Sequence, residues 1–236
     1  MKKIISALFL LSSIALANEY YSKLNPINTY NVKSSVSGQV LYVNNAIESQ
    51  QANNSTIIKI DAVVDKENLK QSEIKLKNLK AILKIEEGVL QSFQKVSSKS
   101  QFDKDNQKVK ILNISSSISD LETQIATLKD QIAKKELYEK DNYIYDIAVE
   151  VGDYVTPGVS LYTSMDMNSG KLEFFIPINK ADEIQTQDIY LNGEKTDLKI
   201  SKLNKVADST HISSYKCEII VPSATKFSTL IKIEFK

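Results

Sequence analysis

Two long segments in the middle of the chain carry apolar residues at alternating steps of three and four positions. In the second segment the steps are strict, and they join Ile111, Ile114, Ile118, Leu121, Ile125, Leu128 and Ile132. The first segment follows the same rhythm less perfectly, with Ser72 and Glu86 as imperfect members, through Leu69, Leu76, Leu79, Leu83, Leu90 and Phe93. This spacing is that of a coiled-coil seam, so it predicts two long helices with narrow apolar stripes.

A polar break at residues 96–101 separates the two stripes. We predict one helix from Asp65, which is suited to cap it, to about Lys95, and a second helix ending near Leu137. Joined by so short a break, they form an antiparallel hairpin whose arms of about 30 residues reach roughly 45 Å. One narrow stripe on an otherwise polar helix favours a hairpin that projects from a domain over one that packs on a globular body.

The segments on both sides of the predicted hairpin alternate between apolar and polar residues as strands do. The first such region covers residues 32–61, and the second runs from residue 143 to the end of the chain. Gly38 marks a turn or bulge in the first region, and Asn192-Gly193 is a strong type I′ hairpin signal in the second. The order of elements is therefore β, then a long helical middle, then β again.

The side-chain chemistry excludes several function classes. All 30 basic residues are lysine, against 29 acidic residues, which argues against nucleic-acid binding and against bidentate recognition of phosphate. The single cysteine, Cys217, excludes an intrachain disulfide and lies in a strand-like alternation that favours a buried apolar role. The single histidine, His211, has no second His or further Cys with which to build a closed metal site, and we place it in a loop. We therefore expect no catalytic residues, no metal and no cofactor.

The N-terminal residues have the composition of a secretory signal peptide. Lys2 and Lys3 precede an apolar run at residues 4–14, and Ala15-Leu16-Ala17 is a small-x-small cleavage site. The run is shorter than the roughly 20 apolar residues that a membrane-spanning helix needs. We expect cleavage after Ala17 and a mature protein in an extracytoplasmic compartment, which the family resemblance described next narrows to the periplasm.

Four features, taken in order, resemble the periplasmic adaptor family, also called membrane fusion proteins and related to the haemolysin-secretion adaptor. Residues 36–40 (Val-Ser-Gly-Gln-Val) resemble the start of its first half-lipoyl segment, and the heptad hairpin follows. Val149, Gly152, Asp153, Val155, Gly158 and Leu161 match the spacing of the second half-lipoyl segment. Residues 172–177 and 181–184 resemble the start of the family's β-barrel.

The resemblance implies an elongated, multidomain α+β fold, in which an antiparallel coiled-coil hairpin is inserted in a split lipoyl-like β-sandwich beside a β-barrel. The implied boundaries are a signal peptide at 1–17, an N-terminal barrel strand at 18–30, half-lipoyl segments at 31–64 and 139–167, the hairpin at 65–138 and the barrel at 168–236. Gly38, Gly152, Asp153 and Gly158 would form the turns of the lipoyl-like part, and a bulky residue at 152 or 158 is expected to collapse it. Asn44, Asn45, Asn53 and Asn54 can supply the turns of the first half.

The function implied by the resemblance is that of an adaptor subunit in a tripartite efflux pump. Such an adaptor links an inner-membrane transporter, here of the resistance-nodulation-division type, to an outer-membrane channel as a ring of several copies. The exported compounds would be drugs, detergents or bile-salt-like molecules. The channel contact falls on the turn between the helices, with Phe102 as an apolar anchor, and comprises Val96, Ser97, Ser98, Lys99, Ser100, Gln101, Phe102 and Asp103.

Four other functions compete with this one. A heavy-metal efflux adaptor stays open, although the Met, Cys and His residues are few and scattered, and so does a type I protein-secretion adaptor. A lipoate or biotin carrier is disfavoured, because Met165-Asp166-Met167 has Asp where the modified lysine would stand. A purely structural coiled-coil protein is disfavoured by the β regions.

Overall fold

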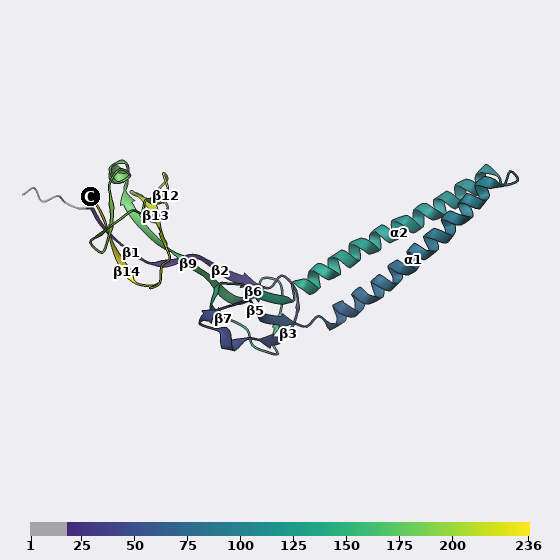
Figure 1. Cartoon of the computed structure of the whole chain (residues 1–236), viewed down its shortest axis with the longest axis horizontal. Coiled ribbons are helices and arrows are strands. Elements are labelled where there is room, and N and C mark those ends of the chain that lie inside the picture. The colour runs from purple at the N-terminus through teal and green to yellow at the C-terminus, as the bar shows by residue number, and fades with distance from the viewer. Residues whose placement is uncertain (1–17) are drawn as a thin grey trace, which may run out of the picture. The chain divides into compact units, whose positions relative to one another are not determined.

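The computed structural model describes residues 18–236, and the signal peptide predicted at residues 1–17 lies outside the described residues. The described chain has a mixed α and β fold, shown in Figure 1, and divides into two compact units. Unit 1 comprises residues 18–29 and 165–236, and unit 2 comprises residues 30–164. None of the helices in residues 18–236 combines the length and the apolar character that crossing a membrane requires.

Unit 1 is built from two antiparallel sheets and a short helical segment. One sheet has the order β1-β14-β10-β11 and consists of β1 (Asn18–Lys23), β14 (Leu230–Phe235), β10 (Ile189–Leu191) and β11 (Glu194–Thr196). The other contains, in order, β12 (Ile200–Leu203), β13 (Ser214–Pro222) and the unit 1 part of β9 (Ser160–Pro177). The helical segment consists of η2 (Ile178–Lys180) and α3 (Ala181–Ile184).

The core of unit 1 follows the period of two that the sequence shows. In β9, Leu172, Phe174 and Ile176 are buried, while the residues between them are more exposed. Phe174 packs against Tyr20 and Phe235, with ring centroids 5.4 and 6.0 Å away. The type I′ turn predicted at Asn192-Gly193 is confirmed, because both residues have positive φ and they join the paired strands β10 and β11.

Cys217 lies in this core and is fully buried, as the strand alternation predicts. Burial, followed by the negative charge of Glu218, raises the pKa of the Cys217 thiol to about 12. We expect the folded protein to resist iodoacetamide at about pH 8, because only the thiolate is nucleophilic, and the denatured protein to react. Alkylation of the folded protein at the rate of a free thiol would contradict this placement.

The same thiol makes the free energy of unfolding depend on pH above the ordinary pKa of cysteine. As pH rises past the ordinary cysteine value of about 8.5, the unfolded chain loses this proton while the folded protein keeps it. The unfolded state then binds fewer protons, so the free energy of unfolding falls, by about 2 kcal/mol at pH 10. Denaturant titrations at neutral pH and at pH 10 measure the change, and a Cys217→Ala variant should lose this component.

Unit 2 contains a β core to which segments on both sides of the long helices contribute. One sheet has the order β6-β5-β3-β8 and consists of β6 (Glu136–Glu139), β5 (Ser55–Ile60), β3 (Gly38–Val43) and β8 (Tyr154–Val155). Further strands are β4 (Gln50–Gln51), β7 (Tyr143–Ile147), the start of β9 and the end of β2 (Asn25–Lys33), with η1 (Asn45–Ile47) before β4. The core includes Val40, Ile57, Ile58, Ile144, Val155 and Leu161, so residues about a hundred positions apart share it.

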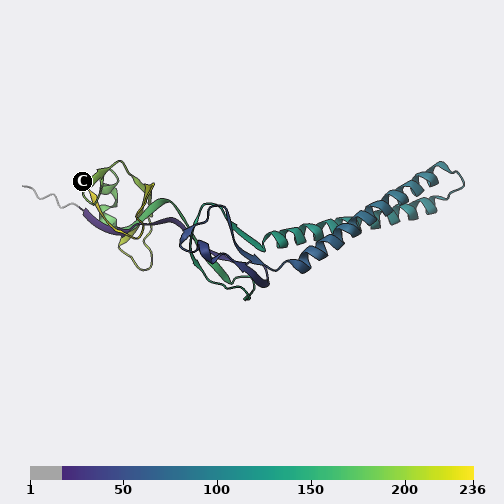
Figure 2. The ribbon, with the colours of Figure 1, turned by 60° about the horizontal axis from the view of Figure 1, so that its bottom comes forward.

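The two long helices of unit 2 are α1 (Val63–Lys95) and α2 (Gln101–Ala133), with 33 residues each. They connect the paired strands β5 and β6 and lie side by side along their length in Figures 1 and 2. The predicted seam is confirmed, because the less exposed side chains of both helices recur at steps of three and four. Ile118, Leu121 and Ile125 are its most buried apolar members.

Both helix boundaries at the base of the pair differ from the prediction. The Val63 N–H donates to Asp61 Oδ1 (2.9 Å), so the helix begins two residues before Asp65. The prediction that helix extends to residues 137–138 is wrong, because α2 ends at Ala133. Residues 136–139 form β6 instead, since their backbone groups pair with β5 and the seam has already ended at Ile132.

The predicted turn residues of unit 2 lie close to β3 and its flanks. The Gly152 N–H donates to Val40 O (2.9 Å), the Val40 N–H donates to Asp153 O (2.8 Å), and Asp153 Oδ2 accepts from the Glu150 N–H (2.9 Å). The Gly158 N–H donates to Ser34 O (2.8 Å). In the first half, Asn53 and Asn54 adopt positive φ as expected, whereas Asn44 does not.

The expectation that bulk at Gly152 or Gly158 collapses the unit is revised. Both glycines have positive φ, at 105° and 95°, but a Cβ at either would meet no atom within 4 Å. A Cβ at Gly38 would instead lie 2.6 Å from Ile60 Cγ2. We expect Gly38→Ala to lower the free energy of unfolding by about 2 kcal/mol through overpacking, and Gly152→Ala by about 1 kcal/mol through backbone strain. Urea titrations of the two variants test this order, which equal losses would contradict.

Candidate docking site

Residues 96–103, which comprise the turn between the helices and the first three residues of α2, are called the tip segment below. Its backbone is closed by two hydrogen bonds. The Lys99 N–H donates to Val96 O (3.3 Å), and the Asp103 N–H donates to Ser100 Oγ (3.1 Å), which makes Ser100 the N-cap of α2. The Asp103 carboxylate lies in the first turn of α2, where the helix dipole favours negative charge. The tip segment is therefore an ordered turn.

Two apolar side chains of the tip segment are open to solvent. Phe102 is 73% exposed and Val96 is 45% exposed. Lys99 Nζ lies 4.5 Å from the centroid of the Phe93 ring, so a cation–π contact holds this lysine against the end of the seam. Aromatic residues are enriched among the side chains that anchor protein interfaces, so Phe102 is the candidate anchor of the tip segment.

Below the tip segment, a polar layer interrupts the apolar seam. The Gln107 side chain donates to Glu86 Oε2 (2.7 Å) and to Glu86 O (2.9 Å), and Lys110 forms an ion pair with Glu86 (2.6 Å). Hydrogen bonds from Gln107 and Lys110 lower the pKa of the Glu86 carboxyl. A polar pair within a seam fixes the register of the two helices, and here it fixes which residues reach the tip.

At the other end of the helices, a charged cluster joins them to the β core of unit 2. Lys135 forms an ion pair with Asp65, and their side chains are only 12% and 23% exposed. Lys135 Nζ also donates to Asp61 O (2.6 Å), beside Gly38. The sequence prediction missed this pair. The available signal was its spacing, since Asp65 and Lys135 continue the steps of three and four beyond Leu69 and Ile132.

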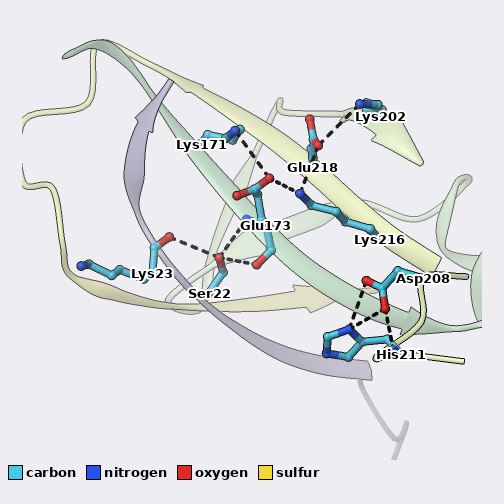
Figure 3. Close-up of polar contacts among 9 residues, drawn as sticks. All are labelled: Ser22, Lys23, Lys171, Glu173, Lys202, Asp208, His211, Lys216 and Glu218. Carbon is cyan, nitrogen blue, oxygen red and sulfur yellow. Dashed lines mark hydrogen bonds and ion pairs between the residues drawn. The ribbon is translucent and has the colours of Figure 1, made fainter. Parts of the chain in front are cut away.

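Unit 1 carries an ion-pair network on its surface. Figure 3 shows Glu173 of β9 between Lys171 and Lys216, and Glu218 between Lys216 and Lys202. Burial alone would raise the pKa of Glu173, but the hydrogen bonds and charges of Lys216 and Lys171 outweigh it and hold this pKa below its ordinary value. A carboxylate neutralised in this way stabilises the sheet and is a poor general base.

His211 has a structural environment in the loop between β12 and β13. Asp208 Oδ1 accepts from the backbone N–H groups of Thr210 (2.8 Å) and His211 (2.6 Å), and the His211 ring contacts the same carboxylate, as Figure 3 shows. These hydrogen bonds, that of the His211 backbone first, lower the pKa of Asp208. The His211 ring stacks on Phe175 with centroids 3.5 Å apart. Within residues 18–236, no group of three or more His, Cys, Asp or Glu side chains is arranged to hold a metal ion.

The fold of the described chain, with paired helices between two neighbouring strands and β segments on both sides sharing a core, is similar to that of several solved structures, one of them described as a membrane fusion protein. MacA from Actinobacillus actinomycetemcomitans superposes with a TM-score of 0.74 at 16% identity, over 93% of this chain and 78% of that one. The membrane fusion protein Spr0693 from Streptococcus pneumoniae gives 0.70 at 10% identity, over 92% and 98%.

A third solved structure, a MacA–MexA chimera that contains the Pseudomonas aeruginosa MexA α-hairpin domain, gives a TM-score of 0.61 at 15% identity, over 94% of this chain and 81% of that one. No protein-family model and no characterised protein matches the chain by sequence. At these identities the likeness shows the fold.

Proposed function

We propose that the protein is a periplasmic adaptor subunit of a tripartite efflux pump and not an enzyme. In this proposal residues 31–64 and 139–167 form the lipoyl-like part, and residues 18–30 with 168–236 form the β-barrel. Several copies form a ring that links an inner-membrane transporter of the resistance-nodulation-division type to an outer-membrane channel. Residues 1–17 direct export to the periplasm.

The observation that carries the proposal is the pair of helices ending in the tip segment. Each helix buries one stripe, and that stripe is used against its partner helix. The fold likeness to MacA and to the MacA–MexA chimera adds support, since the chimera contains an α-hairpin domain. The role of the tip segment is to dock on the channel, with Phe102 as the apolar anchor.

The proposal is tested by the susceptibility of a deletion strain to detergents, bile salts and antibiotics. We expect hypersensitivity that the intact gene rescues. Phe102→Asp should fail to rescue, because losing a central aromatic anchor costs about 2 kcal/mol, or roughly 30-fold in affinity per contact. Leu112→Asp is the matched control, since Leu112 is an exposed apolar residue of the same helix outside the tip segment.

Susceptibility to metals and the secretion of proteins distinguish this proposal from the other two adaptor functions. Sensitivity confined to one metal would favour a heavy-metal efflux adaptor. A strain that resists every compound but fails to secrete a protein would favour a protein-secretion adaptor. Full rescue by Phe102→Asp, with the variant present at the wild-type level, would contradict docking through the tip segment.

A further inference from the structure

Positive charge is concentrated on the helical part of the chain. Residues 63–135 contain 14 lysines and 10 acidic residues, whereas the other described residues contain 14 lysines and 19 acidic residues. The net charge of the whole chain is therefore close to zero because a basic helical pair offsets an acidic remainder. A field of this kind acts on the partner of the helical pair before contact is made.

The lysines at the tip differ from most of their neighbours in having no carboxylate partner. Lys108 pairs with Asp105 and Lys110 pairs with Glu86. Among residues 18–236, no carboxylate lies within ion-pair distance of Lys95, Lys99 or Lys104. Asp103 is the only acidic residue between positions 95 and 104. The end of the helical pair thus presents three uncompensated ammonium groups.

In the sequence these lysines stand on both sides of the exposed apolar residues Val96 and Phe102. Docking that covers Phe102 would also remove water from the lysines on either side of it. Withdrawing an unpaired charge from water costs several kcal/mol unless an opposite charge replaces the water. Lys99 is the most constrained of the three, because its Nζ is already placed over the Phe93 ring. The charge pattern therefore requires negative charge on the surface that covers the tip segment.

We infer that the tip segment, with Lys95 and Lys104, docks on an acidic protein surface whose carboxylates surround an apolar depression that receives Phe102. This inference rests on the proposed function and adds the chemistry of the channel surface. Lysine ammonium groups, as compact point charges, suit carboxylates without demanding the fixed planar geometry of arginine. A lipid surface is disfavoured, because binding in a membrane interface needs a long amphipathic face, and the tip offers one turn with two apolar side chains.

The test measures binding of the purified mature protein to outer-membrane vesicles from the strain that carries the gene. Binding is recorded at low and high salt for the wild type, for a triple Lys→Glu and a triple Lys→Arg variant at positions 95, 99 and 104, and for a tip deletion. The matched control carries Lys→Glu at Lys66, Lys75 and Lys77, three exposed lysines of α1 that also lack a carboxylate partner within the described residues. Vesicles stripped of protein by protease form a parallel series, and circular dichroism checks that each variant is folded.

The expected result is wild-type binding that weakens about tenfold from low to high salt and is lost in the tip Lys→Glu variant. The tip Lys→Arg and control variants should bind like the wild type. Binding that needs the tip segment but ignores salt and charge reversal would overturn the acidic surface and leave the proposed function standing. Binding retained on protease-stripped vesicles would overturn the acidic protein surface as the partner and would favour a lipid surface. Binding unaffected by the tip deletion would instead remove the docking role itself.

Discussion

Replacing Leu121 with aspartate is expected to separate α1 from α2 and to remove most of the helical signal of the protein. Leu121 is 6% exposed at the centre of the buried run of α2, between Ile118 and Ile125. Truncation of a buried leucine alone costs about 2–5 kcal/mol, and a carboxylate at the same place adds the cost of burying a charge. Helices with one narrow stripe have little else to hold them together, since isolated helices are marginal in water.

The measurement is far-ultraviolet circular dichroism across a thermal melt. Leu112→Asp makes the same substitution on the same helix at a side chain that is 66% exposed, and it should change neither the signal nor the midpoint appreciably. The core of unit 1 contains no residue of α1 or α2, so Cys217 should stay protected from alkylation in the Leu121→Asp variant. Equal behaviour of the two variants would contradict the seam.

Replacing Lys135 with methionine is expected to destabilise unit 2 by about 3 kcal/mol, because it leaves the Asp65 carboxylate largely buried without its partner. The Asp61 carbonyl loses the same ammonium group. Lys134→Met is the matched control, since Lys134 is exposed and its ion pair with Asp130 lies within one helical turn. Exposed pairs of that kind contribute under about 1 kcal/mol.

A double-mutant cycle separates the pair from the rest of the cluster. Lys135→Met combined with Asp65→Leu removes both charges and should recover much of the stability that Lys135→Met loses, because apolar replacement of a buried ion pair is often near neutral. Urea titrations of the wild type, the two single variants and the double variant give the coupling free energy between the two side chains. Additive losses would show that the two side chains act independently and would contradict the ion pair as the connection between the helices and the β core.

The sequence alone determined the elements whose signals are local. The seam could be predicted from Ile111 to Ile132 because a helix repeats its faces every 3.6 residues whatever it packs against. The Asn192-Gly193 turn could be predicted because few residues accept positive φ at both central positions. The burial of Cys217 followed from strand alternation, and the tip segment from the polar break between two stripes.

Tertiary structure decided the features that depend on residues far apart in the chain. α2 ends at Ala133 because residues 136–139 pair with β5, some eighty positions earlier, and backbone pairing there outweighs helix propensity. The Lys135–Asp65 ion pair exists only once the helices have folded back along each other. Gly38 approaches Ile60 only once β3 pairs with β5. Likewise, the sequence places Lys95, Lys99 and Lys104 near the turn. Only the folded chain shows that no carboxylate of the described residues lies within ion-pair distance of them. The periodicity of a helix or strand depends only on residues close together in the sequence. The distance between two charges depends on the path of the whole chain between them.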